Sequence, residues 1–149
     1  MKISIPFRIV ALEKTSFHPL VEGEVDNKKI NLIVDTGASR TVFDKQLLNG
    51  YPILKADGVE PIAAGINAET MTVEQVNLPL IKLGDFEFKN MIVFGTDLEG
   101  ISNLYQKMVG ISIDGLLGCD FLEHHKAVLD FSKKRITFNH KVEMNTQEP

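Results

Sequence analysis

Residues 32–39 read LIVDTGAS, so an apolar strand leads directly into a loop that begins with Asp35. Gly37 allows a tight turn that a Cβ atom would block. Thr36 and Ser39 carry hydroxyl groups that can fix the loop or orient a carboxylate. The pattern makes Asp35 a candidate catalytic acid. The alternative is an ordinary turn at the end of a strand, because Asp and Gly both favour turns.

A second motif of the same kind lies about eighty residues further along the chain, where residues 111–118 read ISIDGLLG. Two leucines between glycines, directly after a strand, indicate a buried segment that passes close to other backbone. The acid in this motif is Asp114. The order apolar strand, Asp, Gly thus occurs twice in the chain. This weak internal repeat fits a fold built from two similar halves.

Together the two motifs resemble those of the retropepsin-like aspartic peptidases, in an order and spacing that extend over roughly residues 17–138. The longer segment between Gly95 and Ser112 is closer to the single-domain bacterial members than to the viral enzymes. The resemblance implies a mainly β fold, a closed barrel-like structure with one or two short helices. It also implies that residues 1–149 form a single peptidase domain.

The resemblance assigns a role to each residue of the two motifs. Asp35 would be catalytic, Thr36 would join two loops across a two-fold axis, and Gly37 would contact the substrate backbone. The active-site loop is completed by Ala38, which matches the viral pattern, and Ser39. The second motif would be structural, and it comprises Asp114, Gly115, Leu116, Leu117 and Gly118.

Only one Asp-Thr-Gly occurs in the chain, whereas this chemistry uses two carboxylates that share one proton. The second acid is therefore expected to be Asp35 of a second copy, which makes the protein a homodimer. Asp114 of the same chain is the alternative. The expected function is an aspartic endopeptidase acting on peptides or unfolded proteins. The competing hypothesis is a weakly active or inactive dimerisation or protein-binding module on the same fold.

The segment Pro61–Asn67 lies where family members place a mobile flap over the substrate, and it is rich in small residues. Ala64, Gly65 and Ile66 are the residues expected to contact the substrate. The alternative is an ordinary solvent-exposed loop.

The remaining elements follow from hydrophobic periodicity and turn residues. We expect hairpins of residues 17–34 and 70–94, an extended piece at 41–43, and a closing hairpin of residues 127–138. Asp44 is expected to cap a short helix through Leu48, and a further helix starts at Asp120. Apolar residues at helical spacing in 98–109 predict a helix packed on the sheet: Leu98, Ile101, Leu104, Tyr105, Met108 and Val109.

Composition restricts the functional class. Twenty acidic and 16 basic residues give a net charge of −4, which disfavours binding to nucleic acid. The single cysteine, Cys119, excludes an intrachain disulfide and is expected to be a packed thiol. No apolar run is long enough for a membrane span, and no metal site or cofactor is expected. A cytoplasmic location is favoured, while a secreted or periplasmic form trimmed of its leader stays open.

Overall fold

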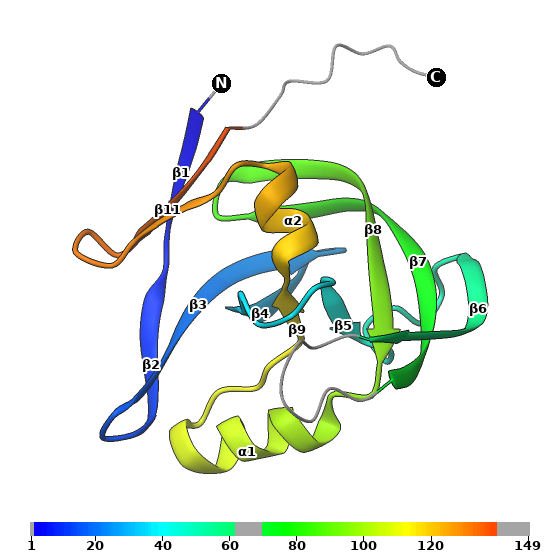
Figure 1. Ribbon diagram of the computed structural model, residues 1–149, viewed down its shortest axis with the longest axis horizontal. Coiled ribbons are helices and arrows are strands. Elements are labelled where there is room, and N and C mark those ends of the chain that lie inside the picture. Colours follow the sequence, from blue (N-terminus) through cyan, green and yellow to red (C-terminus); the bar gives the residue numbers. More distant parts are fainter. Residues whose placement is uncertain (1, 62–69, 140–149) are drawn as a thin grey trace.

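The computed structural model describes residues 2–61 and 70–139. Its main feature is a sheet in the order β2-β3-β4-β9-β5-β8-β7-β6, in which an additional pairing of β3 with β7 closes the strands between them into a barrel (Figure 1). The strands are β1 (Lys2–Pro6), β2 (Arg8–Glu13), β3 (Ser16–Val25), β4 (Lys28–Val34), β5 (Val42–Asp44), β6 (Ile53–Pro61), β7 (Thr70–Leu83), β8 (Phe86–Thr96), β9 (Gly115–Leu117), β10 (Val128–Asp130) and β11 (Arg135–Asn139). The helices are α1 (Glu99–Val109) and α2 (Cys119–His124). The predicted closed, mainly β fold with short helices is confirmed.

The hairpin of β3 and β4 forms as predicted. Its two turn residues, Asp26 and Asn27, both have positive φ angles, 51° and 65°. Asn and Asp tolerate this conformation better than other residues with a side chain, and such a turn matches the right-handed twist of the strands. Beyond the turn, alternate residues of β4 enter the core, and the strand becomes continuously buried from Leu32 to Val34. The second strand of the hairpin is therefore buried in the sheet directly before Asp35.

The two apolar motifs lie side by side in the middle of the sheet. Strands β4 and β9 are parallel, with Leu32 opposite Gly115 and Val34 opposite Leu117. The other side of β9 pairs with β5, which follows the Asp35 loop. Parallel strands covered on both faces need apolar residues throughout, which explains the unbroken runs in both motifs.

Helix α1 forms where predicted, but its packing differs from the prediction. Tyr105 is buried in a cluster with residues of β2, β3 and β4, and Val109 packs against this cluster. Three apolar residues of the helix are instead 40–50% exposed: Ile101, Leu104 and Met108. Each precedes an inward-facing position by one residue, and one residue is about 100° around a helix. The apolar face is therefore too wide for the surface that it covers, and half of it remains in solvent.

The predicted helix between Asp44 and Leu48 is wrong. Residues 45–50 form consecutive turns, with the backbone N–H of Leu47 donating to the carbonyl oxygen of Asp44 and Leu48 donating to Lys45. These bonds span three residues, as in a 3₁₀ turn, and not four. The Asp44 carboxylate accepts a 3.4 Å contact from the N–H of Leu98, so it supports the start of α1.

The terminal strands form a separate three-stranded sheet in the order β1-β11-β10, visible at the upper left of Figure 1. In this sheet β11 is the central strand. Its backbone pairs with β1 along Arg135–Asn139 and with β10 at Arg135–Thr137. The N–H of Asn139 then donates to the carbonyl oxygen of His125. The backbone of β11 is therefore paired on both sides, and β1 and β10 form the outer edges of this sheet.

Candidate active site

Asp35 stands at the end of β4, where the buried strand meets solvent. Its backbone N–H donates to the carbonyl oxygen of Leu117 at 2.9 Å, which extends the pairing of β4 and β9 by one residue. Leu32, Ile33 and Val34 are at most 5% exposed, whereas Asp35 is half-buried. The acid is thus attached to a buried strand in the middle of the sheet and still reaches the surface.

The loop after Asp35 is held by its own backbone. The N–H of Ala38 donates to the carbonyl oxygen of Asp35 at 3.1 Å, and the N–H of Gly37 donates to the Asp35 carboxylate at 2.9 Å. Ala38 is buried, while Thr36 and Ser39 are exposed. A carboxylate bonded to a backbone N–H two residues ahead has a restricted orientation. The predicted loop residues therefore form one compact turn around the Asp35 side chain.

Position 37 requires glycine for a different reason from the tight turn that the sequence suggested. It does not belong to the glycines with positive φ, which are Gly50, Gly84 and Gly110. A Cβ atom on Gly37 would instead lie 3.2 Å from Oδ1 of Asp35. The absence of a side chain therefore leaves room for the carboxylate, and the turn itself needs no unusual backbone.

The glycines of the second motif allow very close approach to the Asp35 loop. A Cβ atom on Gly118 would lie 2.4 Å from the carbonyl oxygen of Arg40, and one on Gly115 would lie 2.8 Å from that of Val42. Between them, Leu117 is fully buried and Leu116 partly buried. These distances leave no space for any side chain at either glycine. The second motif therefore packs directly against the backbone of residues 40–42, which follow Asp35.

Thr41 joins the two motifs and was missed by the sequence reasoning. The side chain is 1% exposed, and its Oγ1 donates to Oδ1 of Asp120 at 2.7 Å. The same oxygen accepts a bond from the N–H of Gly118 at 3.1 Å. A buried hydroxyl with both a donor and an acceptor partner is a specific link. Its only sequence signal was a threonine placed directly after the loop.

Cys119 is exposed, so the expectation of a packed thiol is wrong. The residue opens α2 at the surface beside the Asp35 loop. Its backbone N–H donates to the carbonyl oxygen of Ala38 at 2.8 Å, and its thiol lies 3.1 Å from the carbonyl oxygen of Thr36. Both contacts attach the start of α2 to the loop.

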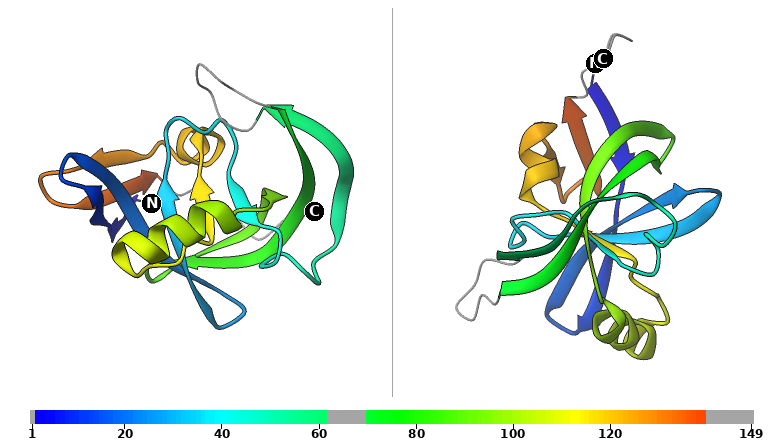
Figure 2. Two further views of the ribbon diagram at one scale, coloured as in Figure 1. Left: turned by 90° about the horizontal axis from the view of Figure 1, so that it is seen from below. Right: turned by 90° about the vertical axis from the view of Figure 1, so that its right-hand side faces the viewer.

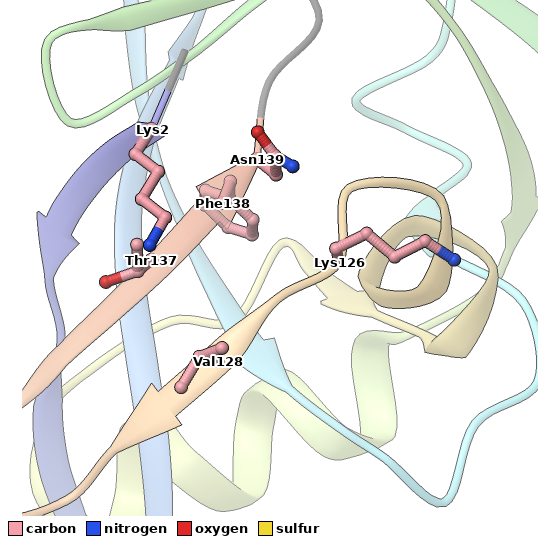
Figure 3. A pocket seen from close by; sticks show the side chains of 6 residues that line it. All are labelled: Lys2, Lys126, Val128, Thr137, Phe138 and Asn139. Atoms are coloured by element: carbon pink, nitrogen blue, oxygen red, sulfur yellow. The ribbon is translucent and has the colours of Figure 1, made fainter.

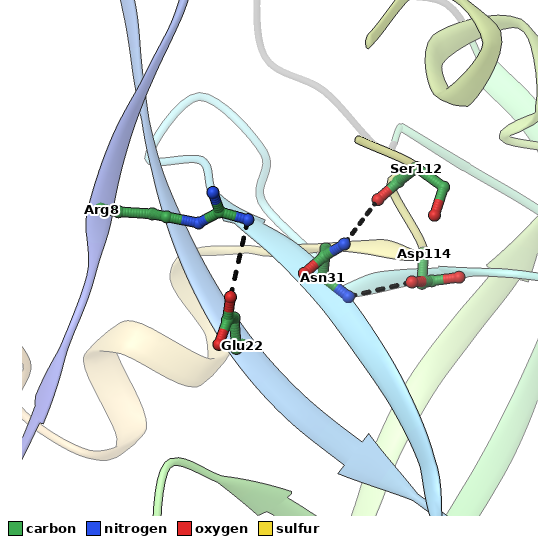
Figure 4. Close-up of polar contacts among 5 residues, drawn as sticks. All are labelled: Arg8, Glu22, Asn31, Ser112 and Asp114. Atoms are coloured by element: carbon green, nitrogen blue, oxygen red, sulfur yellow. Dashed lines mark hydrogen bonds and ion pairs between the residues drawn. The ribbon is translucent and has the colours of Figure 1, made fainter. Parts of the chain in front are cut away.

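Asp114 lies at the other end of the paired strands from Asp35. Its carboxylate accepts a bond from the backbone N–H of Asn31 at 2.9 Å, as Figure 4 shows. Asn31 precedes Asp35 by four residues in an extended strand, a separation of about 13 Å at the usual rise of a strand. The register of β4 and β9 therefore places Asp114 beside Asn31 and away from the Asp35 loop.

Two groups near these motifs have shifted pKa values, the Asp114 carboxyl and the Tyr105 phenol. Burial raises the pKa of the Asp114 carboxyl, and the bond from Asn31 and the charge of Lys28 partly offset this effect. Near Asp35, the phenol of Tyr105 has its pKa raised, first by burial and then by the negative charge of Asp35. Tyr105 thus lies within electrostatic range of Asp35, on the side of the loop covered by α1.

The predicted flap residues Ala64, Gly65 and Ile66 lie outside the described residues. The strands that lead to them are described, with Pro61 of β6 opposite Thr70 of β7. Pro61 therefore belongs to a strand, although the sequence placed it in the loop. Figure 2 shows the last residues of β6 and the first of β7 on the same side of the barrel as the loop that follows β4.

Comparison with known proteins decides the family. A family model described as aspartyl protease matches residues 21–121, which include both motifs and run from the middle of β3 to the middle of α2. The chain belongs to the aspartyl protease family. Family membership therefore confirms the resemblance seen in the sequence.

One similar solved structure supports the same fold. The crystal structure of the retroviral protease-like domain of Ddi1 from Leishmania major is similar, with a TM-score of 0.53, 13% identity, and coverage of 82% of this chain and 88% of that one. A retropepsin-like aspartic protease from Rickettsia conorii matches with 23% identity over 93% of this chain and 90% of that one, at a TM-score of 0.49. A search among curated protein sequences returned no significant match.

We also searched the described residues for metal sites, membrane-spanning helices and pockets. Within residues 2–61 and 70–139, no group of three His, Cys, Asp or Glu side chains is arranged to hold a metal ion. None of the helices described is long and apolar enough to cross a membrane. A small pocket beside the terminal sheet, shown in Figure 3, is lined by Lys2, Lys126, Val128, Thr137, Phe138 and Asn139, and none of these belongs to the Asp35 loop.

The link through Thr41 predicts a loss of stability in the Thr41→Val variant. Valine fills the same space but leaves the buried N–H of Gly118 and the Asp120 carboxylate without this partner, at a cost of about 1–3 kcal/mol. Thr41→Ser is the matched control, because it keeps the hydroxyl and should retain more of the stability. Urea unfolding of the three proteins measures the effect. A valine variant as stable as the serine variant would contradict the role of the hydroxyl.

The raised pKa of Asp114 predicts a pH-dependent effect of Asp114→Asn. A carboxyl with a higher pKa in the folded chain ionises more easily in the unfolded chain, so its contribution to stability falls as the pH rises above 3.8. Asparagine does not ionise and keeps an oxygen for the N–H of Asn31. The free energy of unfolding of the variant, relative to wild type, should therefore increase with pH until Asp114 is fully ionised.

Asp130→Asn is the control with the opposite sign. Bonds from Ser132 and Lys133 lower the pKa of the Asp130 carboxyl, so its contribution to stability grows as the pH rises towards 3.8. Urea unfolding over a pH series should give opposite slopes for the two variants. Equal slopes would show that Asp114 does not titrate as its burial indicates.

Proposed function

We propose that the protein is an aspartic endopeptidase whose active site is made by two copies of the chain. The observation that carries this proposal is the half-buried Asp35 at the exposed end of β4, in a loop whose Gly37 N–H orients its carboxylate at 2.9 Å. Membership of the aspartyl protease family supports the reaction class. The loop offers one acid, and the reaction needs two.

The second carboxylate is proposed to come from Asp35 of another copy. The acids in and just after the second motif are engaged elsewhere: Asp114 accepts a bond from the backbone N–H of Asn31, and Asp120 accepts bonds from Thr41 and from the N–H of Phe121. A two-fold axis beside the loop would bring two Asp35 side chains together with no further residue needed. Such an isologous contact closes on itself and gives a dimer.

In the proposed reaction, the two Asp35 carboxyl groups share one proton, because two adjacent negative charges repel. The ionised group takes a proton from a water molecule, whose oxygen attacks the carbonyl carbon of the scissile peptide bond. The protonated group donates its proton to the carbonyl oxygen. The carboxyl group that took the water proton then gives it to the nitrogen, and the C–N bond of the tetrahedral intermediate breaks. The other carboxylate takes a proton from a hydroxyl of the intermediate, which releases an amine and a carboxylic acid and leaves one proton on the pair.

The fixed parts of the site suit this chemistry. The loop backbone is attached to β9 through the bond between Asp35 and Leu117, and to α2 through the bond between Cys119 and Ala38. These contacts allow little movement of the acid relative to the barrel. Groups held in the geometry of the reaction need no further ordering when the substrate binds.

Asp35→Asn is predicted to abolish peptide cleavage while leaving the fold intact. Asparagine has the shape of the acid but can neither take nor share the proton, so the rate should fall at least about a thousandfold. Cleavage of an unfolded protein substrate measures activity, and circular dichroism with urea unfolding measures the fold. Asp85→Asn, in the exposed turn between β7 and β8, is the control and should retain activity. Full activity in Asp35→Asn would reject the assignment.

The two-chain site predicts that Asp35→Asn chains inhibit wild-type chains. With an about ninefold excess of variant and random pairing, only about a tenth of wild-type chains would have a wild-type partner. Activity per wild-type chain should fall in proportion, and dilution of pure wild type should lower its specific activity as dimers dissociate. Sedimentation of the same samples reports the association state. A monomer with dilution-independent activity would place the second acid in the same chain.

A further inference from the structure

Tyr105 of α1 is buried, yet its hydroxyl has no hydrogen-bond partner among residues 2–61 and 70–139. The residue is 6% exposed, and its one ring contact is with His18, at a centroid distance of 5.7 Å and an interplanar angle of 70°. A buried tyrosine O–H usually has a partner, because leaving it without one costs the free energy of its desolvation. An unpaired buried hydroxyl therefore indicates a ligand or a water molecule that binds it.

The sheet places Tyr105 on the face that carries the Asp35 side chain. Side chains two residues apart in a strand point to the same face, and the bond of the Asp35 N–H to Leu117 continues the strand pairing as far as the acid. Asp35 therefore shares a face with Ile33, about 7 Å away at the usual rise of a strand. Ile33 belongs to the buried cluster of Tyr105, and Leu116, opposite Ile33 in β9, packs against this cluster.

The hydroxyl end of Tyr105 is the end that senses the acid. The negative charge of Asp35 contributes, after burial, to the raised pKa of the phenol, and this charge acts on the phenol oxygen. The phenol therefore stays protonated and can donate a hydrogen bond. The two side chains are not bonded to each other in the described structure, so the O–H can serve a group bound beside Asp35.

The surroundings of Tyr105 restrict the chemistry of such a group. The buried members of its cluster are all apolar: Val10, Leu20, Ile33 and Ile113. An apolar surface with a single donor suits a side chain that has an apolar stem and one acceptor at its end. An ionised carboxylate is disfavoured, because it would lose water beside two acids that already share a negative charge. A neutral acceptor such as a carboxamide oxygen meets both conditions.

We propose that the Tyr105 hydroxyl donates a hydrogen bond to a neutral acceptor on a substrate side chain beside the scissile bond, with the carboxamide of Gln or Asn as the group that it recognises. This proposal rests on the peptidase function proposed above, which places the scissile bond at Asp35. With two copies of the chain, one Tyr105 accompanies each Asp35. The recognition therefore applies to the residues on both sides of the scissile bond.

The test uses short peptide pools that differ only in one central residue, which is Gln, Met or Glu. Met resembles Gln in length but lacks the amide. The ratio of kcat/KM for cleavage beside Gln to that beside Met is measured for wild type, Tyr105→Phe and Tyr51→Phe. This ratio should fall at least about threefold in Tyr105→Phe, the usual strength of a neutral hydrogen bond.

Tyr51→Phe is the matched control. Tyr51 is the other tyrosine of the chain, and its hydroxyl bonds Asp26 at the turn between β3 and β4. The variant removes the same atom at a different place and should keep the Gln to Met ratio of wild type. A general loss of activity would slow both pools together and leave the ratio unchanged.

Urea unfolding separates recognition of the substrate from a structural role of the hydroxyl. Phenylalanine keeps the ring, and a buried hydroxyl without a partner contributes nothing to stability, so Tyr105→Phe should be at least as stable as wild type. A less stable variant with an unchanged Gln to Met ratio would assign the hydroxyl to a buried water molecule and overturn the proposal. An unchanged ratio in a stable variant would also overturn it. Faster cleavage by wild type beside Glu than beside Gln at neutral pH, where Glu is ionised, would contradict a neutral acceptor.

A binding measurement keeps this result distinct from that of the peptidase proposal. Fluorescence anisotropy gives the Kd of the labelled Gln and Met pools for Asp35→Asn, with and without Tyr105→Phe. If wild type cleaves no peptide, the endopeptidase proposal fails, and a Gln to Met preference in binding that requires the Tyr105 hydroxyl would still support its recognition of the carboxamide. A binding preference that Tyr105→Phe leaves unchanged would overturn that recognition, whether or not wild type cleaves peptides.

Discussion

The close approach of the second motif to the Asp35 loop is the constraint on which the rest of the site depends. Gly118 comes so near to the carbonyl oxygen of Arg40 that a Cβ atom would lie at 2.4 Å, well inside van der Waals contact. This contact requires glycine, the buried apolar strands on either side, and the hydroxyl of Thr41 that bonds Gly118. The loop packs against the second motif on its buried side, so the carboxylate of Asp35 can be fixed in position and still accessible.

The two motifs are alike in sequence but they do different things in space. Asp35 follows its strand and reaches the surface, whereas Asp114 precedes its strand and bonds the backbone of Asn31. Because β4 and β9 run parallel, these acids lie at opposite ends of the paired strands. One chain thus places one half-buried acid at this loop, and the need for a second carboxylate is the physical reason to propose two copies.

The parts around this centre are less tightly specified. Helix α1 covers the cluster of Tyr105 beneath the loop, yet it leaves Ile101, Leu104 and Met108 in solvent. The terminal sheet uses β11 as its centre, which satisfies the backbone of that strand on both sides. The guanidinium of Arg40, from the loop that follows Asp35, lies over the ring of Phe94 in β8.

The sequence by itself determined the hairpins and the apolar strand that leads to Asp35, because apolar periodicity and turn residues such as Asp26 and Asn27 act over a few neighbours. The resemblance of its two motifs to those of a known family also indicated the closed barrel. The sequence could not determine contacts between distant segments. The turns after Asp44, the exposed side of α1, the exposure of Cys119 and the link from Thr41 to Asp120 all depend on which surfaces meet. Only the tertiary structure decided these, because a side chain is buried or bonded by residues far away in the chain.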